Sequence, residues 1–306
     1  LKDIGTDVID QNFIGDFACS SNGQGAVEQW TAVYDGLGDG SNHAFAVCCG
    51  PQGNVFVAGK ESNSPNCVII KYEPQNGEAD WIADFGDQNF NSVIRDMAVD
   101  ESGCIYVTGS CGNTDTNCLT AKYSPDGNEL WSRHYNGPAK ENDDPCSIAT
   151  DQSGNVYITG TSLTGGYGDI ITIKYNSDGT QLWAQPYTGD AYYIDKGRDI
   201  AIDDSGNVYI TGSAYTMASM SQDSVTIKYD PNGVEQWVSI YNNTANLNDA
   251  TTKIALDQSG TLYVAGTVEK QYLADYDYLL IKYDPNGSII WQTVYDMREF
   301  DIPKDL

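Results

Sequence analysis

The sequence contains few of the residues that most often carry catalysis, and it lacks long apolar runs. Only two histidines, His43 and His134, occur in 306 residues. Neither lies beside a nucleophile motif such as G-x-S-x-G. The apolar runs extend over a few residues, whereas a membrane-spanning helix needs about 20. The sequence therefore predicts a protein that is not an enzyme, binds no cofactor and has no membrane-spanning helix.

Basic residues are also scarce. The chain has 16 lysines and arginines against 43 aspartates and glutamates, which gives a formal net charge of −27. Such a charge repels phosphate backbones and anionic membrane surfaces, so nucleic-acid binding is excluded as a function class. The composition is typical of a solvated acidic surface.

Eight cysteines are present, but no C-x-x-C pair occurs, and all eight lie in the first half of the chain. This spacing excludes zinc-finger and c-type haem attachment sites. An even number of cysteines in an acidic, tyrosine-rich chain favours disulfides in an oxidising compartment. Cys111 and Cys118 flank a short loop, and we expect them to form a local pair.

What the sequence does contain is an internal repeat, marked by all six tryptophans. They are spaced by 51, 50, 52, 54 and 54 residues: Trp30, Trp81, Trp131, Trp183, Trp237 and Trp291. Each begins the pattern Trp-x-x-x-aromatic, and five are preceded by a Lys-Tyr pair and, further upstream, by segments such as GNVYITG. Repetition at this period indicates that the chain is built from one supersecondary unit used again and again.

Each unit reads as four short strands. In the fourth unit we expect strands at Asp199–Asp203, Asn207–Gly212, Asp223–Tyr229 and Val234–Tyr241, because these segments are short and rich in Val, Ile, Thr and Tyr. The first and second strands are joined by turns such as DDSG, and the third and fourth by turns such as DPNG. In both turns Asp can bond the backbone and Gly supplies a positive φ.

Four-stranded antiparallel units at this period predict an all-β fold, a six-bladed β-propeller that forms a single domain over residues 1–306. The tryptophans are expected to pack between blades. The segment Phe17–Gly23 lines up with the repeated turn IKYDPNG, so the chain begins inside a blade. The tail after Trp291 would then supply the missing strand, and the N- and C-terminal strands would close the ring in one shared blade.

The segment DQSGNVYITG, followed by DIITIKYNSDGTQLW, resembles the SBBP-type β-propeller repeat of bacterial and archaeal extracellular and cell-surface proteins. The resemblance covers about five units, roughly residues 43–291. It implies a secreted or surface-exposed interaction module, without catalytic residues that could be transferred to this chain.

The units are nearly constant at these two kinds of turn and diverge in the loops at the opposite ends of the strands. A rigid scaffold that displays variable loops is how binding sites are commonly presented. The richest stretch is DAYYID, and tyrosines with nearby acceptors suit protein partners or sugars. The predicted binding residues are Asp190, Tyr192, Tyr193, Asp195, Tyr215, Tyr272 and Tyr276. The alternative is that these tyrosines only pack loop against loop.

Two further kinds of site follow from local sequence. Loop carboxylates make candidate cation sites at Asp143 with Asp144, near Asn142, and at Asp275 with Asp277, although the turns themselves lack the pattern of a calcium loop. The sequons NNT and NGS make Asn242 and Asn286 candidate glycosylation sites.

Three functions remain open at this point. The first is a non-catalytic extracellular interaction or structural propeller, with a protein partner or self-assembly into a cell-surface structure. The second is a carbohydrate-binding propeller that takes a glycan. The third is a hydrolase or lyase that uses loop carboxylates.

Overall fold

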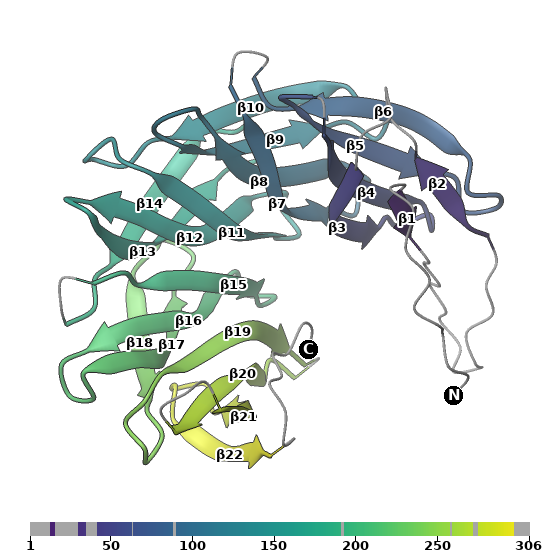
Figure 1. Cartoon of the computed structure of the whole chain (residues 1–306). Coiled ribbons are helices and arrows are strands. Elements are labelled where there is room, and N and C mark those ends of the chain that lie inside the picture. The colour runs from purple at the N-terminus through teal and green to yellow at the C-terminus, as the bar shows by residue number, and fades with distance from the viewer. Residues whose placement is uncertain are drawn as a thin grey trace.

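The computed structural model describes residues 13–15, 30–34, 42–62, 64–87, 90–190, 193–257, 259–271 and 275–296 (Figure 1). Every named element in this part of the chain is a β-strand. None of the residues described here forms a helix able to cross a membrane.

The strands form five four-stranded antiparallel sheets and one two-stranded hairpin. The hairpin pairs β1 (Phe13–Gly15) with β2 (Ala32–Tyr34). The first sheet contains β3 (Asn42–Cys49), β4 (Val55–Glu61), β5 (Cys67–Tyr72) and β6 (Ala79–Phe85). The second contains β7 (Ser92–Val99), β8 (Ile105–Cys111), β9 (Asn117–Tyr123) and β10 (Glu129–Tyr135).

The remaining three sheets repeat this order. The third contains β11 (Asp143–Thr150), β12 (Val156–Thr164), β13 (Tyr167–Tyr175) and β14 (Gln181–Tyr187). The fourth contains β15 (Lys196–Ile202), β16 (Val208–Thr216), β17 (Ser221–Tyr229) and β18 (Glu235–Tyr241). The fifth contains β19 (Asp249–Leu256), β20 (Leu262–Gln271), β21 (Asp275–Tyr283) and β22 (Ile289–Tyr295).

The sequence-based assignment of four strands per unit is confirmed. In the fourth unit β15 to β18 overlap the four expected segments, with ends that differ by up to four residues, and neighbouring strands pair in sequence order. The middle strands β16 and β17 are almost wholly buried, because both of their faces pack against neighbouring sheets. This explains why VYITG and VTIKY do not alternate between apolar and polar residues.

In the second to fifth sheets, an aspartate holds the turn between the first two strands; the turn of the first sheet has Gly50 in its place. In the fourth unit Asp203 Oδ1 accepts from the backbone N–H of Ser205 and Asn207, each at 2.9 Å. Its other oxygen accepts from Tyr209 Oη at 3.0 Å. Asn207 Nδ2 also donates to this oxygen, at 2.8 Å. Against the effect of burial, the Asn207 amide and the other donors hold the pKa of Asp203 below its usual range. The repeated D-x-S-G motif is thus a structural turn, as expected.

The core lies between successive sheets, where the tryptophans pack. Trp183 Nε1 donates to Pro231 O of the next unit at 3.2 Å. Its ring lies 6.1 Å from that of Tyr157 and 6.3 Å from that of Tyr229. The same contact, an indole N–H to a turn carbonyl of the following unit, recurs at Trp30, Trp81, Trp131 and Trp237. The prediction that the tryptophans pack between blades is confirmed for these five.

In space the sheets follow one another along an arc, with the β1–β2 hairpin at one end and the β19–β22 sheet at the other (Figure 1). The first strands of successive sheets contact one another: β3 with β7, β7 with β11, β11 with β15, and β15 with β19. Across the described strands the arc remains open between its two ends. The predicted turn at Phe17–Gly23 and residues 297–306 of the C-terminal tail lie outside the described residues.

Candidate functional site

The loops that differ between units gather on one face, as predicted. Backbone hydrogen bonds join the segments that cross into the second, third and fourth sheets, just before β7, β11 and β15, to the loop or third strand of the preceding sheet. Asp195 N donates to Gly168 O at 2.7 Å, and Gly168 N donates to Tyr193 O at 3.2 Å. The crossing after β14 is therefore fixed against the start of β13, which gives its side chains a rigid support.

Tyr193 and Tyr215 form the most prominent aromatic pair of this face. Their rings stack with centroids 3.9 Å apart and an interplanar angle of 17°. Tyr193 is 53% exposed. The structure thus brings together two of the predicted binding residues from different segments. Tyr192 and Tyr272, which were predicted beside them, lie outside the described residues.

Asp195 occupies a different place from the one expected. Its side chain is 1% exposed. Its carboxylate accepts from the backbone N–H of Gly189 at 2.7 Å and of Tyr215 at 2.9 Å. Asp195 therefore holds the crossing in position and does not lie on the surface. Asp190 is exposed, in agreement with the prediction.

A groove of about 500 Å³ opens beside Tyr193, between the fourth and fifth sheets. Tyr193, Ile194 and Tyr276 form much of its apolar wall, and Gln222 and Asn248 contribute amides. Gln222 Nε2 donates to Ile194 O at 2.9 Å. Asn248 Nδ2 donates to Glu269 Oε2 at 2.7 Å. The groove therefore has fixed walls that combine aromatic and polar groups, the composition expected of a binding site.

A second groove, of about 390 Å³, lies on the other side of β15 and shares Ile194, Lys196 and Arg198 with the first. Arg95 lines it and binds the carboxylate of Asp144, with Nη2 at 2.9 Å from Oδ1 and 3.1 Å from Oδ2. Neither Lys196 nor Arg198 was predicted from the sequence. Comparing the first strands of the units in register would have shown that basic residues gather there.

Three polar side chains meet between β7, β11 and β15, and none of them was predicted from the sequence as a site residue. Ser147 Oγ lies 2.8 Å from Asp96 Oδ2 and 2.9 Å from Asp199 Oδ1. Burial raises the pKa of both carboxyl groups, against the effect of their hydrogen bonds. The Ser147 hydroxyl has one proton and can donate it to only one of the two carboxyl groups. Both contacts of Ser147 are hydrogen bonds when the other carboxyl group holds a proton and donates it to the hydroxyl oxygen. This cluster joins β7, β11 and β15.

The candidate cation sites are occupied by protein partners. Asp143 is 1% exposed and accepts from Gly137 N at 2.9 Å, while Asp144 binds Arg95. Asp277 pairs with Lys270 Nζ at 2.5 Å. Asp275 begins β21, and its side chain lies outside the described residues. In the ranges given above, no group of three or more metal-ligating side chains could hold an ion.

The predicted disulfide between Cys111 and Cys118 is wrong. Cys111 pairs with Asn117 across the β8–β9 hairpin, and Cys118 pairs with Ser110. Because successive residues of a strand point to opposite faces, the two thiols lie on opposite faces of the sheet. Cys111 accordingly packs in the core on one side and Cys118 in the core on the other. All seven cysteines of the described residues are free thiols, and Cys19 lies outside them.

The two sequons lie in different settings. Asn286 is exposed in the turn between β21 and β22. Asn242 is half-buried, and its Nδ2 donates to Asn246 Oδ1 at 2.8 Å.

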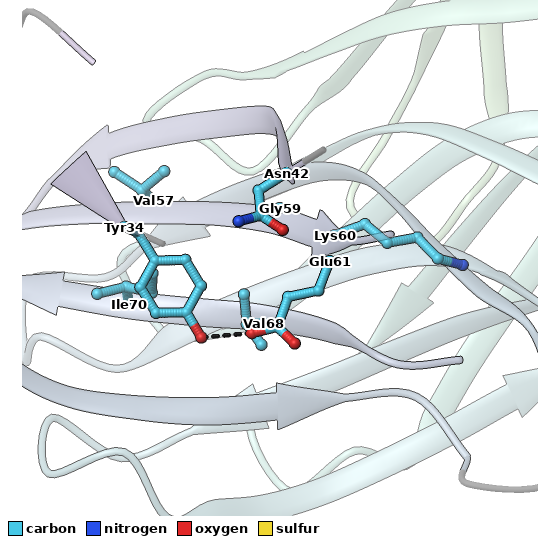
Figure 2. Close-up of a pocket in the computed structure, with 8 residues that line it drawn as sticks. All are labelled: Tyr34, Asn42, Val57, Gly59, Lys60, Glu61, Val68 and Ile70. Atoms are coloured by element: carbon cyan, nitrogen blue, oxygen red, sulfur yellow. Dashed lines mark hydrogen bonds between the residues drawn. The ribbon is translucent and has the colours of Figure 1, made fainter. Parts of the chain in front are cut away.

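A third hollow lies between the β1–β2 hairpin and the first sheet (Figure 2). Tyr34 Oη donates to Glu61 Oε1 at 2.5 Å there. Figure 2 shows Tyr34 lying over Val68 and Ile70, with this bond on one side. The free volume is only about 10 Å³, about enough for one water molecule. It is a packing feature and no candidate ligand site.

Comparisons with known proteins support the propeller assignment. Residues 131–168 and 187–216 match the family model described as "SBBP: Beta-propeller repeat". No curated protein matches the chain significantly. Among solved structures, the Dos1 propeller is similar with a TM-score of 0.57 and 10% identity, over 87% of this chain and 62% of that one. This likeness shows the fold alone. The chain thus spans less than two thirds of that protein.

Two other solved structures are similar at a lower level. A europium-containing methanol dehydrogenase has a TM-score of 0.47 and 14% identity, over 79% of this chain and 60% of that one. A protein of unknown function from Dyadobacter fermentans has a TM-score of 0.47 and 10% identity, over 69% of this chain and 70% of that one. The chain is therefore an all-β protein of β-propeller type, built from five four-stranded antiparallel sheets and an N-terminal hairpin.

Proposed function

We propose that this chain is a non-catalytic interaction module that binds a protein partner through its variable loop face. The observation that carries the proposal is the groove of about 500 Å³ beside Tyr193, between the fourth and fifth sheets. It lies on the face where the repeat units diverge, and its walls are fixed by backbone hydrogen bonds to the sheets.

The composition of the groove suits such a role. Exposed tyrosines combine a large contact area with a hydroxyl and lose little conformational entropy when they are covered. Tyr193 is already held against Tyr215, which lowers the ordering cost on binding. A few rigid aromatic residues of this kind often supply most of the binding energy of an interface.

The proposal includes a closed ring of six blades within a single domain over residues 1–306. It is supported by the β1–β2 hairpin, which adds two strands beyond the five sheets. It is also supported by Trp291, which is 40% exposed, whereas the equivalent Trp131 is 8% exposed. A sixth blade formed by both termini would cover Trp291 in the way that the later units cover the other tryptophans.

An extracellular or cell-surface location is also part of the proposal. It rests on the similarity of two segments to the SBBP repeat and on the acidic composition. The cysteines give no support, since those described are free thiols. In such a location the partner would be another surface protein or a further copy of this chain.

A carbohydrate ligand is the second candidate, and the stacked Tyr193–Tyr215 pair favours it. An aromatic face next to the amides of Gln222 and Asn248 is a common way to bind a sugar ring. A hydrolase or lyase has less support. The loop-face carboxylates of Asp144, Asp195 and Asp249 are all held by donors of the protein itself.

The test compares two exposed apolar residues on different parts of the molecule. Tyr193→Ser removes an aromatic ring from the groove, and Leu182→Ser is a matched control on β14 at the outer edge. Native mass spectrometry of each variant isolated from its source measures which protein is bound. We expect the partner to be retained by Leu182→Ser and lost by Tyr193→Ser. Equal retention would refute the loop face as the binding face. A glycan array tests the carbohydrate alternative.

A further inference from the structure

The two loop-face grooves meet along one strand, β15. Ile194, Lys196 and Arg198 line both of them, so the grooves of about 390 and 500 Å³ lie on either side of a shared wall. The two cations lie two residues apart on this strand, and both are exposed. The shared wall therefore carries two positive charges between two grooves.

A β-bulge sets the position of Arg198. The register of β15 on β16 shifts between Gly197 and Asp199, which leaves Arg198 as the extra residue. Bulges redirect side chains and often lie next to binding sites. The equivalent bulge residues of β7 and β11 are Arg95 and Cys146, and both line the smaller groove.

The cations of the shared wall have no acidic partner among the described residues, although the chain carries a formal net charge of −27. Arg198 lies near the Cys146 thiol, which is neutral when protonated. The carboxylates that line the two grooves are already satisfied: Asp144 binds Arg95, and Asp249 accepts from Asn243. Asp249 also has its pKa raised to about 7, mainly by burial. The wall is therefore a local excess of positive charge on an acidic molecule.

Two further features favour an extended chain over a compact anion. Apolar residues, among them Tyr193 and Ile194, flank the cations. In addition, Gln222 Oε1 is buried and has no donor among the described residues, and a peptide N–H would supply one. In an extended peptide, alternate side chains lie on one face, two residues apart. That is also the separation of Lys196 and Arg198 along β15.

We propose that the β15 wall binds an acidic, extended peptide segment of the partner, whose alternating carboxylates pair with Lys196 and Arg198 while the intervening apolar side chains enter the grooves. This inference rests on the proposed function and specifies the chemistry of the partner. The net charge of the whole chain repels an acidic peptide at long range. At a salt concentration of about 0.15 M, charges more than about 8 Å apart are screened, which removes this repulsion. The affinity for the acidic peptide should therefore weaken little, or even strengthen, as salt rises to this concentration.

The probe is a fluorescein-labelled octapeptide of alternating Glu and Leu, and its matched control has Gln in place of Glu. Fluorescence anisotropy measures binding to the full chain and to three variants: Lys196→Gln, Arg198→Gln and Lys140→Gln. Lys140 is exposed and lines neither groove. We expect the Gln peptide to bind at least tenfold more weakly than the Glu peptide. We also expect Lys196→Gln and Arg198→Gln each to weaken the Glu peptide about tenfold, and Lys140→Gln to leave it unchanged.

Each contrary result has a distinct meaning. Equal binding of the Glu and Gln peptides, or no effect of Lys196→Gln and Arg198→Gln, would overturn the carboxylate site. If polygalacturonate binds with the same dependence on these two residues and the peptide does not, the ligand is an acidic sugar and the peptide assignment is wrong. Loss of the partner in Tyr193→Ser without any binding of the acidic peptide would contradict this inference alone and leave the proposed function standing. Thermal melting of each variant confirms that it is folded.

Discussion

The indole ring of Trp183 lies directly against Gly233 of the following unit. A Cβ added to Gly233 would come within 2.8 Å of Trp183 Cδ2. The backbone of Gly233 has a φ of 82°, which L-residues rarely adopt. The glycine of the repeated turn is thus required twice, by its own conformation and by the tryptophan of the neighbouring sheet.

This contact predicts a large cost for Gly233→Ala. We expect a loss of about 2–4 kcal/mol in the free energy of unfolding, from left-handed backbone strain together with overpacking. Gly260→Ala is the control, since Gly260 has a φ of 76° but nothing within 4 Å of its added Cβ. It should cost only about 1–2 kcal/mol. Urea unfolding measures both, and equal costs would show that the tryptophan contact contributes nothing.

A second prediction concerns closure of the ring. If a sixth blade covers Trp291, then Trp291→Ala should destabilise the chain about as much as Trp131→Ala, by about 3–5 kcal/mol. If the propeller stays open, Trp291 remains 40% exposed, and Trp291→Ala should lower the free energy of unfolding much less. Denaturant unfolding of the full chain with each substitution measures the difference. A cost for Trp291→Ala under about 1 kcal/mol would argue against closure by the termini.

The pH dependence of stability should reflect Asp249. Burial raises its folded-state pKa to about 7, well above the value near 3.9 of an unfolded chain. The folded protein therefore binds this proton more tightly than the unfolded one. The contribution of this proton to the free energy of unfolding is fully present below about pH 4 and is lost as pH rises through 7. Asp249→Asn mimics the protonated form and should flatten the decline in stability between pH 5 and 8.

Thermal unfolding at several pH values checks this prediction. Asp190→Asn removes an exposed carboxyl group and serves as the control, which should keep the wild-type pH profile. A profile for Asp249→Asn that parallels the wild type between pH 5 and 8 would show that Asp249 is ionised without penalty in the folded state.

The free thiols give a simpler prediction. Since none of the seven described cysteines forms a disulfide, reducing agent should leave the melting temperature unchanged. Titration of the unfolded, unreduced chain with a thiol reagent should detect at least seven thiols. Fewer thiols, together with a melting temperature that falls on reduction, would show that cysteines are paired in the native protein.

Much of the fold could be predicted because the repeat makes each unit a copy of the others. The strands of the fourth unit, the D-x-S-G turn at Asp203 and the packing of Trp183 all follow from patterns that recur at the same spacing. Local turn chemistry and alternation determine these features, and both are visible in a short stretch of sequence.

The errors arise where geometry across strands decides the outcome. Cys111 and Cys118 are close in sequence, but their register on opposite strands places them on opposite faces of the sheet. Asp195 was expected on the surface, yet it occupies the same place in its unit as Asp143 and Asp249, which are also buried. That recurrence was the available signal of a structural role.

The candidate site was predicted only in part, for a related reason. Tyr193 and Tyr215 stand out as tyrosines in segments that differ between units, so their face could be identified, although Tyr215 lies in β16 and not in a loop. Lys196 and Arg198 line the grooves because a bulge and the meeting of three sheets bring them there. Ser147 contacts Asp96 and Asp199 across about fifty residues in each direction of the chain. Contacts of this kind depend on how the units pack and leave no pattern within a single unit.

The central claim is that the partner binds the loop face, and hydrogen–deuterium exchange of the chain with and without its recovered partner tests it most directly. We predict slower exchange in the partner complex within residues 193–198, which border both grooves, and within residues 248–252, which border the larger one. The turns around Asp203 and Asp230, at the opposite ends of the strands, should exchange as they do in the free chain. Protection confined to those turns, with residues 193–198 and 248–252 unchanged, would contradict the account.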